Sequence, residues 1–598
     1  MKSNADNIYN ILSQNSTSFY IPPFQRGYAW GEEEIERYFQ DIKNVIDSEN
    51  DPEQRDKLEH FLGIVVINQE KEGFGTRSVI IDGQQRLTST LLLIIAIRDL
   101  EVDQLKKTFI EDTFLRNNAS TLEDKIKLKQ VTSDWDAYRS LINGTEMLSG
   151  KITDAYNAFL TRVRAEDYIA EDYIQALHKI NLAAIFLDER PHKGEDPQII
   201  FETLNSLGRP LTFGDLIRNY IMLGMPSKHQ AQIYDDIWFP KIEEVLKERT
   251  SHFFRDVMQL KMSQYLKVIN DNNTKNLYGQ FKLFVDQYYY GDKEDFISQV
   301  TRLVGLYHLI DTGIVLQEVG KSEKSKEKIL ELIRNIFRDI GAEAFKPFIL
   351  GVLDFHQNGI HGVFLPDEQL IAVLEVVCTY LIRRRVINLT QMENRFIPGL
   401  CMEIEARAAH FVLDGRGEML KLLSSGIYRG RMPNDLEIEQ TLKRIDFYNG
   451  LKRYSKFILG KIEEHISKVA VPFRDSKITI EHIMPQKIDK SASWKEALGG
   501  EWHDVHRSYI HNIGNLILSD YNGEMGNKDF VAKKEILTQS NLGYRNDVLV
   551  YQSWGEEAIL FHQRKMIIRF LETFPLPLEM QKEENWGSND SGDESEDI

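Results

Sequence analysis

An acidic residue and a histidine stand side by side in the segment Ile480-Glu481-His482-Ile483-Met484-Pro485-Gln486. About thirty residues later the chain reads Asn515-Leu516-Ile517-Leu518-Ser519-Asp520-Tyr521-Asn522. A histidine of near-neutral pKa can take a proton from an attacking water. Carboxylate and amide oxygens are hard ligands that suit Mg²⁺ or Mn²⁺. Together, these residue types could hydrolyse a phosphodiester with the help of one divalent cation.

Each piece taken alone is a weak signal, because a Glu-His pair is common on surfaces and a single Asn in a loop is more often a turn residue than a ligand. The surrounding elements strengthen the combination. Residues 477–480 predict a short strand, residues 516–518 predict a second, and residues 527–538 have apolar positions at helical spacing. We therefore expect a strand–strand–helix unit that positions His482 and Asn522.

This unit resembles the ββα-metal fold of HNH nucleases. Its first segment is similar to Val-Asp-His-Ile-Val-Pro-Gln in the HNH domain of RNA-guided CRISPR nucleases, with Glu481 in place of the Asp. The resemblance implies that His482 is the general base and that Asn515 braces the loop that holds it. It also implies that Glu481 and Asn522 are the metal ligands. His511 is an alternative ligand or phosphate contact, or it simply caps the turn.

A second constellation lies in the amino-terminal part of the chain. Residues 61–68 and 78–81 predict strands, Asp82-Gly83 predicts a tight turn, and Arg86–Leu100 predicts a helix with an apolar face. A glycine turn at a helix N-terminus exposes backbone N–H groups and the positive end of the helix dipole, which suits a phosphate. Arg86 adds a bidentate donor for the same anion. From these residues alone, a plain strand–turn–helix corner with Arg86 paired to an acid is an equal alternative.

Two further motifs flank this turn. Pro-Pro-Phe-Gln-Arg-Gly-Tyr occupies residues 22–28, and Phe-Glu-Thr-Leu-Asn-Ser-Leu-Gly-Arg-Pro-Leu occupies residues 201–211. In this order, the three motifs closely resemble the ParB/sulfiredoxin-like NTPase domain of GmrSD-type modification-dependent restriction enzymes, a family that also carries an HNH segment. The resemblance covers about residues 10–220 and 450–575.

The resemblance implies that Gln25 and Arg26 face the phosphates of a bound NTP (GTP, UTP or ATP). Asn205 and Arg209 would close the pocket or transmit its state to the helices that follow. Gln85 and Arg86 would be catalytic in NTP hydrolysis. The loop expected to bind the nucleotide consists of five consecutive residues: Asp82, Gly83, Gln84, Gln85 and Arg86.

Bulk composition is that of a globular protein with several domains. The 598 residues are 42% hydrophobic and 27% charged, and two cysteines are too few for a disulfide framework. The first ten residues lack the apolar core of a signal peptide, and the run Leu91–Ile97 is too short to span a bilayer. We therefore expect a cytoplasmic protein that has no membrane segment, with Leu91–Ile97 in a buried helix.

The net charge of −18 argues against a general attraction to nucleic acid. Residues 582–598 hold seven acidic residues against Lys582, which leaves −12 for the rest of the chain. Double-stranded DNA must therefore be met by local basic patches. The candidates, each of which could also be an ordinary solvated face, are Arg383-Arg384-Arg385, Arg429-Gly430-Arg431, Lys452-Arg453 and Lys533-Lys534.

The predicted fold class is α+β and predominantly helical. Four regions are expected: a ParB/sulfiredoxin-like α/β domain in residues 1–225, a helical coupling region in residues 226–450, a ββα-metal (HNH) nuclease domain in residues 451–575, and a disordered acidic tail in residues 576–598. Helical spacing in the coupling region is clearest in Lys326–Ile340 and Asp367–Arg383.

The expected function is that of an NTP-regulated, metal-dependent DNA endonuclease in bacterial anti-phage defence, of type IV-like restriction. Its substrate would be foreign, modified double-stranded DNA such as that of phages. The alternative is a binding protein that senses a nucleotide or modified DNA, joined to a phosphorothioate-dependent or unregulated nicking domain. A homodimer is left open.

Overall fold

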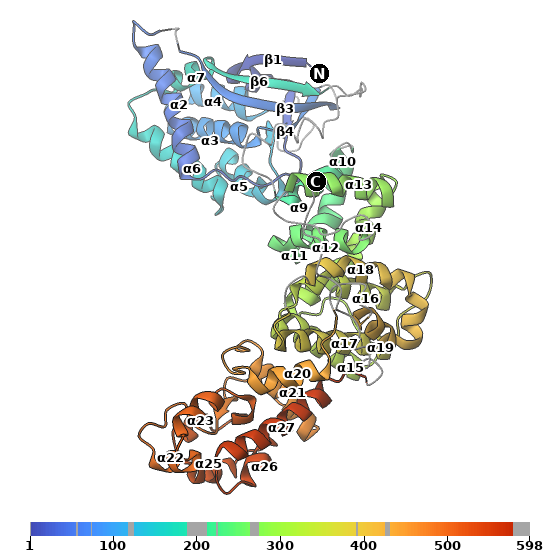
Figure 1. The fold of residues 1–598 in the computed structure, drawn as a ribbon. Coiled ribbons are helices and arrows are strands. Elements are labelled where there is room, and N and C mark those ends of the chain that lie inside the picture. The colour runs from blue at the N-terminus through green and yellow to red at the C-terminus, as the bar shows by residue number, and fades with distance from the viewer. Residues whose placement is uncertain are drawn as a thin grey trace, which may run out of the picture. The chain divides into compact units, whose positions relative to one another are not determined.

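The computed structural model describes residues 2–55, 58–72, 75–117, 125–187, 212–222, 225, 227–262, 274–389, 393–424 and 431–577. The chain forms two compact units (Figure 1). Unit 1 comprises Met1–Ser251 and Asp271–Ile297, and unit 2 comprises His252–Asn270 and Ser298–Ile598. The predicted class, predominantly helical α+β, is confirmed. The predicted tail lies outside the described residues from position 578 onwards.

Unit 1 contains a six-stranded mixed sheet of order β1-β6-β3-β4-β2-β5. Its strands are β1 (Lys2–Asn7), β2 (Thr17–Tyr20), β3 (His60–Glu72), β4 (Gly75–Asp82), β5 (Leu128–Lys129) and β6 (Ile180–Leu187). β3 pairs antiparallel with β4 and parallel with β6. Both β3 and β4 are longer than the apolar runs predicted, because their hairpin pairing continues through polar residues as far as Glu72 and Gly75.

Helices gather on one side of this sheet (Figure 1). α3 (Gln84–Leu100) contacts α6 (Lys151–Ala165) and α7 (Ala170–Leu177), and α2 (Glu32–Asn50) also contacts both. Every residue of α3 from Leu87 to Arg98 is buried. Leu91–Ile97 therefore lies in a helix enclosed on all sides, as a continuous apolar run requires.

The middle of unit 2 is helical. The predicted helix at Lys326–Ile340 is found as α15 (Glu323–Arg334) followed directly by η4 (Asn335–Ile340), and the one at Asp367–Arg383 is found as α17 (Asp367–Val386). α17 packs against α15 and α19 (Ala408–Ser424). None of the described helices combines the length and the apolar character needed to cross a membrane.

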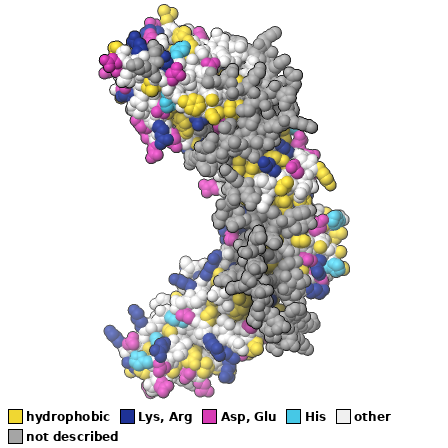
Figure 2. Space-filling model, turned by 45° about the horizontal axis from the view of Figure 1, so that its top comes forward, with side chains coloured by type: hydrophobic (Ala, Val, Ile, Leu, Met, Phe, Trp, Pro, Cys, Tyr) yellow, Lys and Arg dark blue, Asp and Glu magenta, His cyan; other side chains and the backbone are white. Residues whose placement is uncertain are grey.

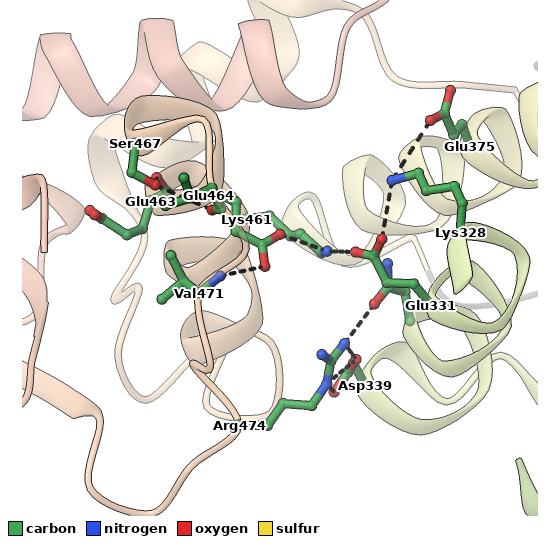
Figure 3. A network of polar contacts seen from close by, with 12 residues as sticks. Lys328, Glu331, Asp339, Glu375, Lys461, Glu463, Glu464, Ser467, Val471 and Arg474 are labelled. Carbon is green, nitrogen blue, oxygen red and sulfur yellow. Dashed lines mark hydrogen bonds and ion pairs between the residues drawn. The ribbon is translucent and has the colours of Figure 1, made fainter. Parts of the chain in front are cut away.

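A polar network joins these helices to α21 (Ser455–Ser467), the helix that precedes the candidate nuclease strands (Figure 3). Lys461 on α21 pairs with Glu331 on α15 and, at 2.8 Å, with Glu464. Lys328 lies 3.2 Å from the Glu331 carboxylate. The Arg474 guanidinium binds Asp339 of η4 at 2.6 Å. α21 and the segment after it are thus tied to the helical region by charge.

The arginine run at the end of α17 is buried, so the prediction that it could be a DNA-facing patch or a solvated face is wrong. The Arg383 guanidinium donates to the carbonyls of Pro433 at 2.9 Å and Phe574 at 2.8 Å, and to the Asp435 carboxylate at 2.5 Å. Phe574 and Asp435 stand just beyond a helix end and at a helix start, respectively. Carbonyls at the C-terminal end of a helix lack intrahelical donors, so the Phe574 carbonyl needs a donor such as Arg383.

The C-terminal part of unit 2 contains the predicted strand–strand–helix order. β7 (Thr479–His482) pairs antiparallel with β8 (Leu516–Ser519), and α25 (Phe530–Leu537) follows. The Asp529 carboxylate caps α25 by accepting from Ala532 N at 2.9 Å. β7 begins two residues later than predicted, so that Glu481 and His482 belong to the strand. Helices α22 (Ala492–Leu498) and α23 (Trp502–Tyr509), which were not predicted, occupy the connection.

Glu331→Gln should destabilise unit 2, because it removes the anion that Lys461 and Lys328 share. Burial by itself raises the pKa of Glu331, but the Lys461 and Lys328 ammoniums lower this pKa to about 2. The carboxylate therefore contributes its full stability above the ordinary glutamate pKa, and this contribution is lost as the pH falls towards 2. We expect a loss of about 1–3 kcal/mol at neutral pH. The difference in unfolding free energy between the variant and wild type, measured by calorimetry, should shrink as the pH is lowered from about 7 to about 3.

The matched control is Glu375→Gln. Its carboxylate lies 3.9 Å from Lys328 and pairs at 2.6 Å with Arg416, whose side chain is about half exposed. Its loss should cost less than about 0.5 kcal/mol. An equal effect of the two substitutions, or a difference that does not shrink with acid, would contradict the role assigned to Glu331.

Candidate functional site

The β7–β8 pairing brings the two candidate nuclease motifs together. Glu481 lies opposite Ile517, and His482 lies opposite Leu516. Both Glu481 and His482 are buried, at 3% and 6% exposure. Because the register places the end of β7 beside the start of β8, His482 comes next to the loop that contains Asn515.

The His482 imidazole is surrounded by polar and aromatic groups. Its Nε2 lies 3.1 Å from Nδ1 of His511, and its Nδ1 lies 3.2 Å from the amide nitrogen of Gln486. The Tyr448 ring meets it edge-on at 4.6 Å between centroids and stacks on His511 at 5.5 Å. Burial, together with the neighbouring His511 and Lys533, lowers the pKa of His482 to about 4. The imidazole is therefore neutral near pH 7, the form that can accept a proton.

Asn515 holds the turn that follows β7. Its Oδ1 accepts from Met484 N at 2.7 Å and from the Trp554 indole at 3.1 Å. Its Nδ2 donates to the carbonyls of Met484 and Ile510, both at 3.0 Å. The fully buried amide thus uses its donors and its acceptor on three segments of the chain.

Glu481 does not face an open cavity. Its Oε1 accepts from Lys533 Nζ at 2.5 Å, and the same ammonium donates to the carbonyl of His482 at 2.7 Å. Lys533 is buried with 0% exposure, and Lys534 donates to the carbonyl of Tyr551. Burial raises the pKa of Glu481 and lowers that of Lys533, and each partner opposes the shift of the other. The prediction that Lys533 belongs to a surface patch is wrong.

The position of Lys533 in the helix could have shown that its side chain is buried. It stands three residues after Phe530 and four before Leu537, both of which are buried. A residue at this spacing shares their face of the helix and must be buried with them.

Asn522 lies in the short helix α24 (Asn522–Met525) beside β7. Its Nδ2 donates to Thr479 Oγ1 at 2.8 Å and to the Ile480 carbonyl at 2.9 Å. Both bonds use the amide nitrogen, which leaves Oδ1 as the atom that could bind a ligand.

The donor set does not fit a divalent cation as these side chains stand. The Glu481 carboxylate is paired with Lys533, and the Asn522 Oδ1 would then be the single remaining ligand of the expected pair. Within the part of the chain that the structure describes, no group of three or more His, Cys, Asp or Glu side chains is placed to hold a metal ion.

The amino-terminal candidate residues also converge. Gln84 donates to the Arg26 carbonyl at 3.1 Å, and Gln25 donates to the Ile80 carbonyl at 2.6 Å. Gln85 accepts from Ala29 N at 2.8 Å and donates to the Gly27 carbonyl. Three glutamine amides are thus engaged with main chain, and they fix the 25–29 loop against the end of β4 and the start of α3.

Charged groups gather at the same corner. Burial raises the pKa of Asp82, opposed by a hydrogen bond from Gly83 N and by the nearby Arg86 and Arg26. The Arg86 guanidinium donates to the Ile64 carbonyl at 3.1 Å. Gly83 has φ +92° in a left-handed turn, and an added Cβ would lie 2.7 Å from Val65 Cγ2, so only glycine fits there.

Asp134 was not singled out from the sequence, yet its carboxylate accepts from Tyr28 N at 2.5 Å and lies against Gly27. Nothing in the local pattern marks it, since it stands in a helix some fifty residues beyond the turn. Tyr28 itself is buried and is bonded to Ser89 at 2.7 Å. Asn205 and Arg209, expected to close this pocket, lie outside the described residues.

Two family comparisons match the two ends of the chain. The N-terminal domain of the GmrSD restriction endonuclease matches residues 8–222. The C-terminal domain of GmrSD restriction endonucleases matches residues 432–568, which include His482, Asn515 and Lys533. No curated protein matches the chain.

Asn515→Asp tests the contacts of this buried amide. The carboxylate can still accept from Met484 N and Trp554, but it cannot donate to the carbonyls of Met484 and Ile510. We expect a loss of stability of about 2–3 kcal/mol, since two buried carbonyls lose their donor and a charge is buried. Thermal unfolding followed by tryptophan fluorescence measures it. The same exchange at exposed Asn527 should change little; comparable melting temperatures for the two variants would refute the assignment.

Proposed function

Because the chain belongs to the GmrSD restriction endonuclease family, and is therefore a restriction endonuclease whose substrate is DNA, we propose that its C-terminal site cuts DNA under the control of a nucleotide bound to unit 1. The proposal places the enzyme in anti-phage defence, with foreign, modified double-stranded DNA as its target. The observation that carries it is the meeting of His482 with Asn515 and His511 across the β7–β8 pairing.

In the proposed reaction, His482 takes the proton from the water that attacks the phosphodiester. The lowered pKa keeps the His482 imidazole neutral near pH 7, the form that can accept a proton, while it also makes the imidazole a weaker base. Asn515 holds the turn after β7 and so keeps the imidazole in place. Mg²⁺ or Mn²⁺ remains part of the proposal through the family resemblance alone, since Glu481, one of the two expected ligands, is paired with Lys533.

The proposed nucleotide site is the corner formed by Asp82, Gly83 and Arg86. The N-terminus of the long helix α3 and the guanidinium groups of Arg86 and Arg26 provide positive charge near one point. A triphosphate of GTP, UTP or ATP has the matching charge. This chemistry supports nucleotide binding at the corner.

One observation favours a second candidate for unit 1, a sensor that binds the nucleotide without turnover. Both polar atoms of the Gln85 amide, expected to be catalytic, bind main chain. A side chain held in this way is suited to fixing the loop rather than to orienting water. The two candidates differ in phosphate release from an NTP: the purified full-length protein should release phosphate if unit 1 is an NTPase and should not if unit 1 is a sensor.

His482→Ala should lower DNA cleavage by about 10²–10⁴-fold, the usual contribution of a general base, and leave NTP hydrolysis unchanged. Arg86→Ala should abolish NTP hydrolysis or uncouple it from cutting. The measurement is plasmid cleavage across modified and unmodified phage DNAs, with and without each NTP, alongside phosphate release.

The control is His503→Ala, which removes an exposed histidine stacked on Trp502. Cleavage by this variant should equal wild type. If His482→Ala cuts as well as the control does, the site is wrongly assigned.

Exposed lysines beside the site provide a route for phosphate contact. Lys487 and Lys490 follow Gln486, whose amide contacts His482, and both are exposed. Neither forms an ion pair with any residue that the structure describes. Figure 2 shows Lys and Arg side chains, in dark blue, on the surface of the lobe that carries the C-terminal helices. Local positive charge is what a chain of net charge −18 needs to meet DNA.

Replacing Lys487 and Lys490 together by Ala should weaken DNA binding on every sequence. If each lysine contacts one phosphate, the slope of log affinity against log salt should fall by about 0.9 per lysine. Fluorescence anisotropy measures the DNA affinity between roughly 50 and 200 mM salt, the range in which salt weakens such binding strongly. Lys324→Ala, an exposed lysine on α15, serves as the control and should keep the wild-type slope.

A further inference from the structure

The Lys533 ammonium is the most deeply buried charge next to the candidate base. The side chain is 0% exposed, and that of its partner Glu481 is 4% exposed. Nζ reaches the Glu481 carboxylate at 2.5 Å and the His482 carbonyl at 2.7 Å. Lysine is almost never fully buried unless it is paired, so the two contacts explain its place. With no exposure, the ammonium cannot be a DNA contact.

We propose that Lys533 is a positioning residue of the nuclease site, whose ammonium clamps the main chain of His482 while Glu481 neutralises it. The proposal rests on the proposed function, in which His482 is the base. In this proposal the Glu481 carboxylate pairs with the Lys533 ammonium and is not a metal ligand.

The main chain at His482 shows why a clamp is effective there. His482 is the last residue of β7, and beyond it the strand pairing ends. The peptide unit that follows is held at both ends: Lys533 binds its carbonyl, and its N–H, from Ile483, donates to the Asn515 carbonyl at 3.0 Å. A displacement of about 1 Å at a reacting group can cost about 100-fold in rate, so holding this unit fixes the imidazole where it must act.

The edge of β7 provides independent support. In a strand, alternate carbonyls point to the same side, so those of Ile480 and His482 share one edge. Asn522 binds the first at 2.9 Å and Lys533 binds the second at 2.7 Å. The two side chains from α24 and α25 therefore close the strand edge that β8 does not cover.

The buried pair also determines how it can be tested. Removing one partner leaves an uncompensated charge inside the protein, whereas replacing both by neutral groups of similar size is tolerated far better. Lys533→Met and Glu481→Gln preserve volume. The double variant E481Q/K533M should therefore recover stability but still lack the donor to the His482 carbonyl.

The experiment compares K533M, E481Q and E481Q/K533M in the full-length protein. Stability is read from the melting temperature, and activity from the single-turnover cleavage rate on the DNA that wild type cuts best. Binding is read from the DNA dissociation constant and from the Mn²⁺ concentration that gives the half-maximal rate. Amide hydrogen exchange of peptides covering residues 479–486 reports on the main chain at His482. K533M should slow cleavage by about 100-fold with unchanged DNA affinity. The double variant should regain wild-type melting while cleavage stays about 100-fold slow. Exchange at residues 479–486 should be faster in both variants that lack the lysine.

Two outcomes would overturn the proposal. If E481Q/K533M regains cleavage along with stability, the pair is structural only. If E481Q raises the half-maximal Mn²⁺ concentration by about tenfold or more, Glu481 is a metal ligand. The control is Asp547→Asn, which breaks another buried ion pair of the same region, with Arg569, and should lower melting while leaving cleavage intact. Hydrogen exchange does not depend on DNA cleavage. It therefore tests the contact between Lys533 and the His482 main chain even if wild type does not cut DNA and the proposed function is wrong.

Discussion

A two-stranded sheet of four residues per strand cannot stand alone in water, and every polar main-chain group that it buries must find a partner. This constraint governs the C-terminal site. The carbonyls on the outer edge of β7 are bound by Asn522 and Lys533, and the turn that follows β7 is bound by Asn515. Each of these side chains is polar, buried or half-buried, and comes from an element that is later in sequence. The candidate base at the end of β7 is held in place because its backbone is satisfied in this way.

The amino-terminal corner meets the same constraint with different residues. There the glutamine amides of Gln25, Gln84 and Gln85 bind main-chain groups of the 25–29 loop and of the end of β4. The charged residues Asp82 and Arg86 stand beside this scaffold. In both sites, many of the polar residues that look catalytic in the sequence hold the main chain in place, and fewer remain that could take part in a reaction.

Within unit 2, ion pairs also join helices near β7 and β8 in sequence to the helical region. Lys461 with Glu331, and Arg383 with Asp435, tie α21 and the start of α20 (Asp435–Arg444) to α15 and α17. Such contacts are costly to break, because an unpaired charge would remain inside. Breaking them should therefore destabilise unit 2.

The sequence by itself determined the main elements that carry both sites, the residue types there and the family. Short β-branched runs, helical spacing and the order of motifs depend only on neighbours in the chain, and β7, β8, α25 and α3 lie close to where they were predicted. The domain boundaries and the site roles stay predictions. Only the tertiary structure decided which partners the buried polar side chains find. Lys533 shares the apolar face of its helix, but the sequence shows neither its partners nor those of Arg383, because carbonyls and carboxylates from distant segments converge on both side chains. A local pattern cannot show such partners, since they are brought together by folding alone.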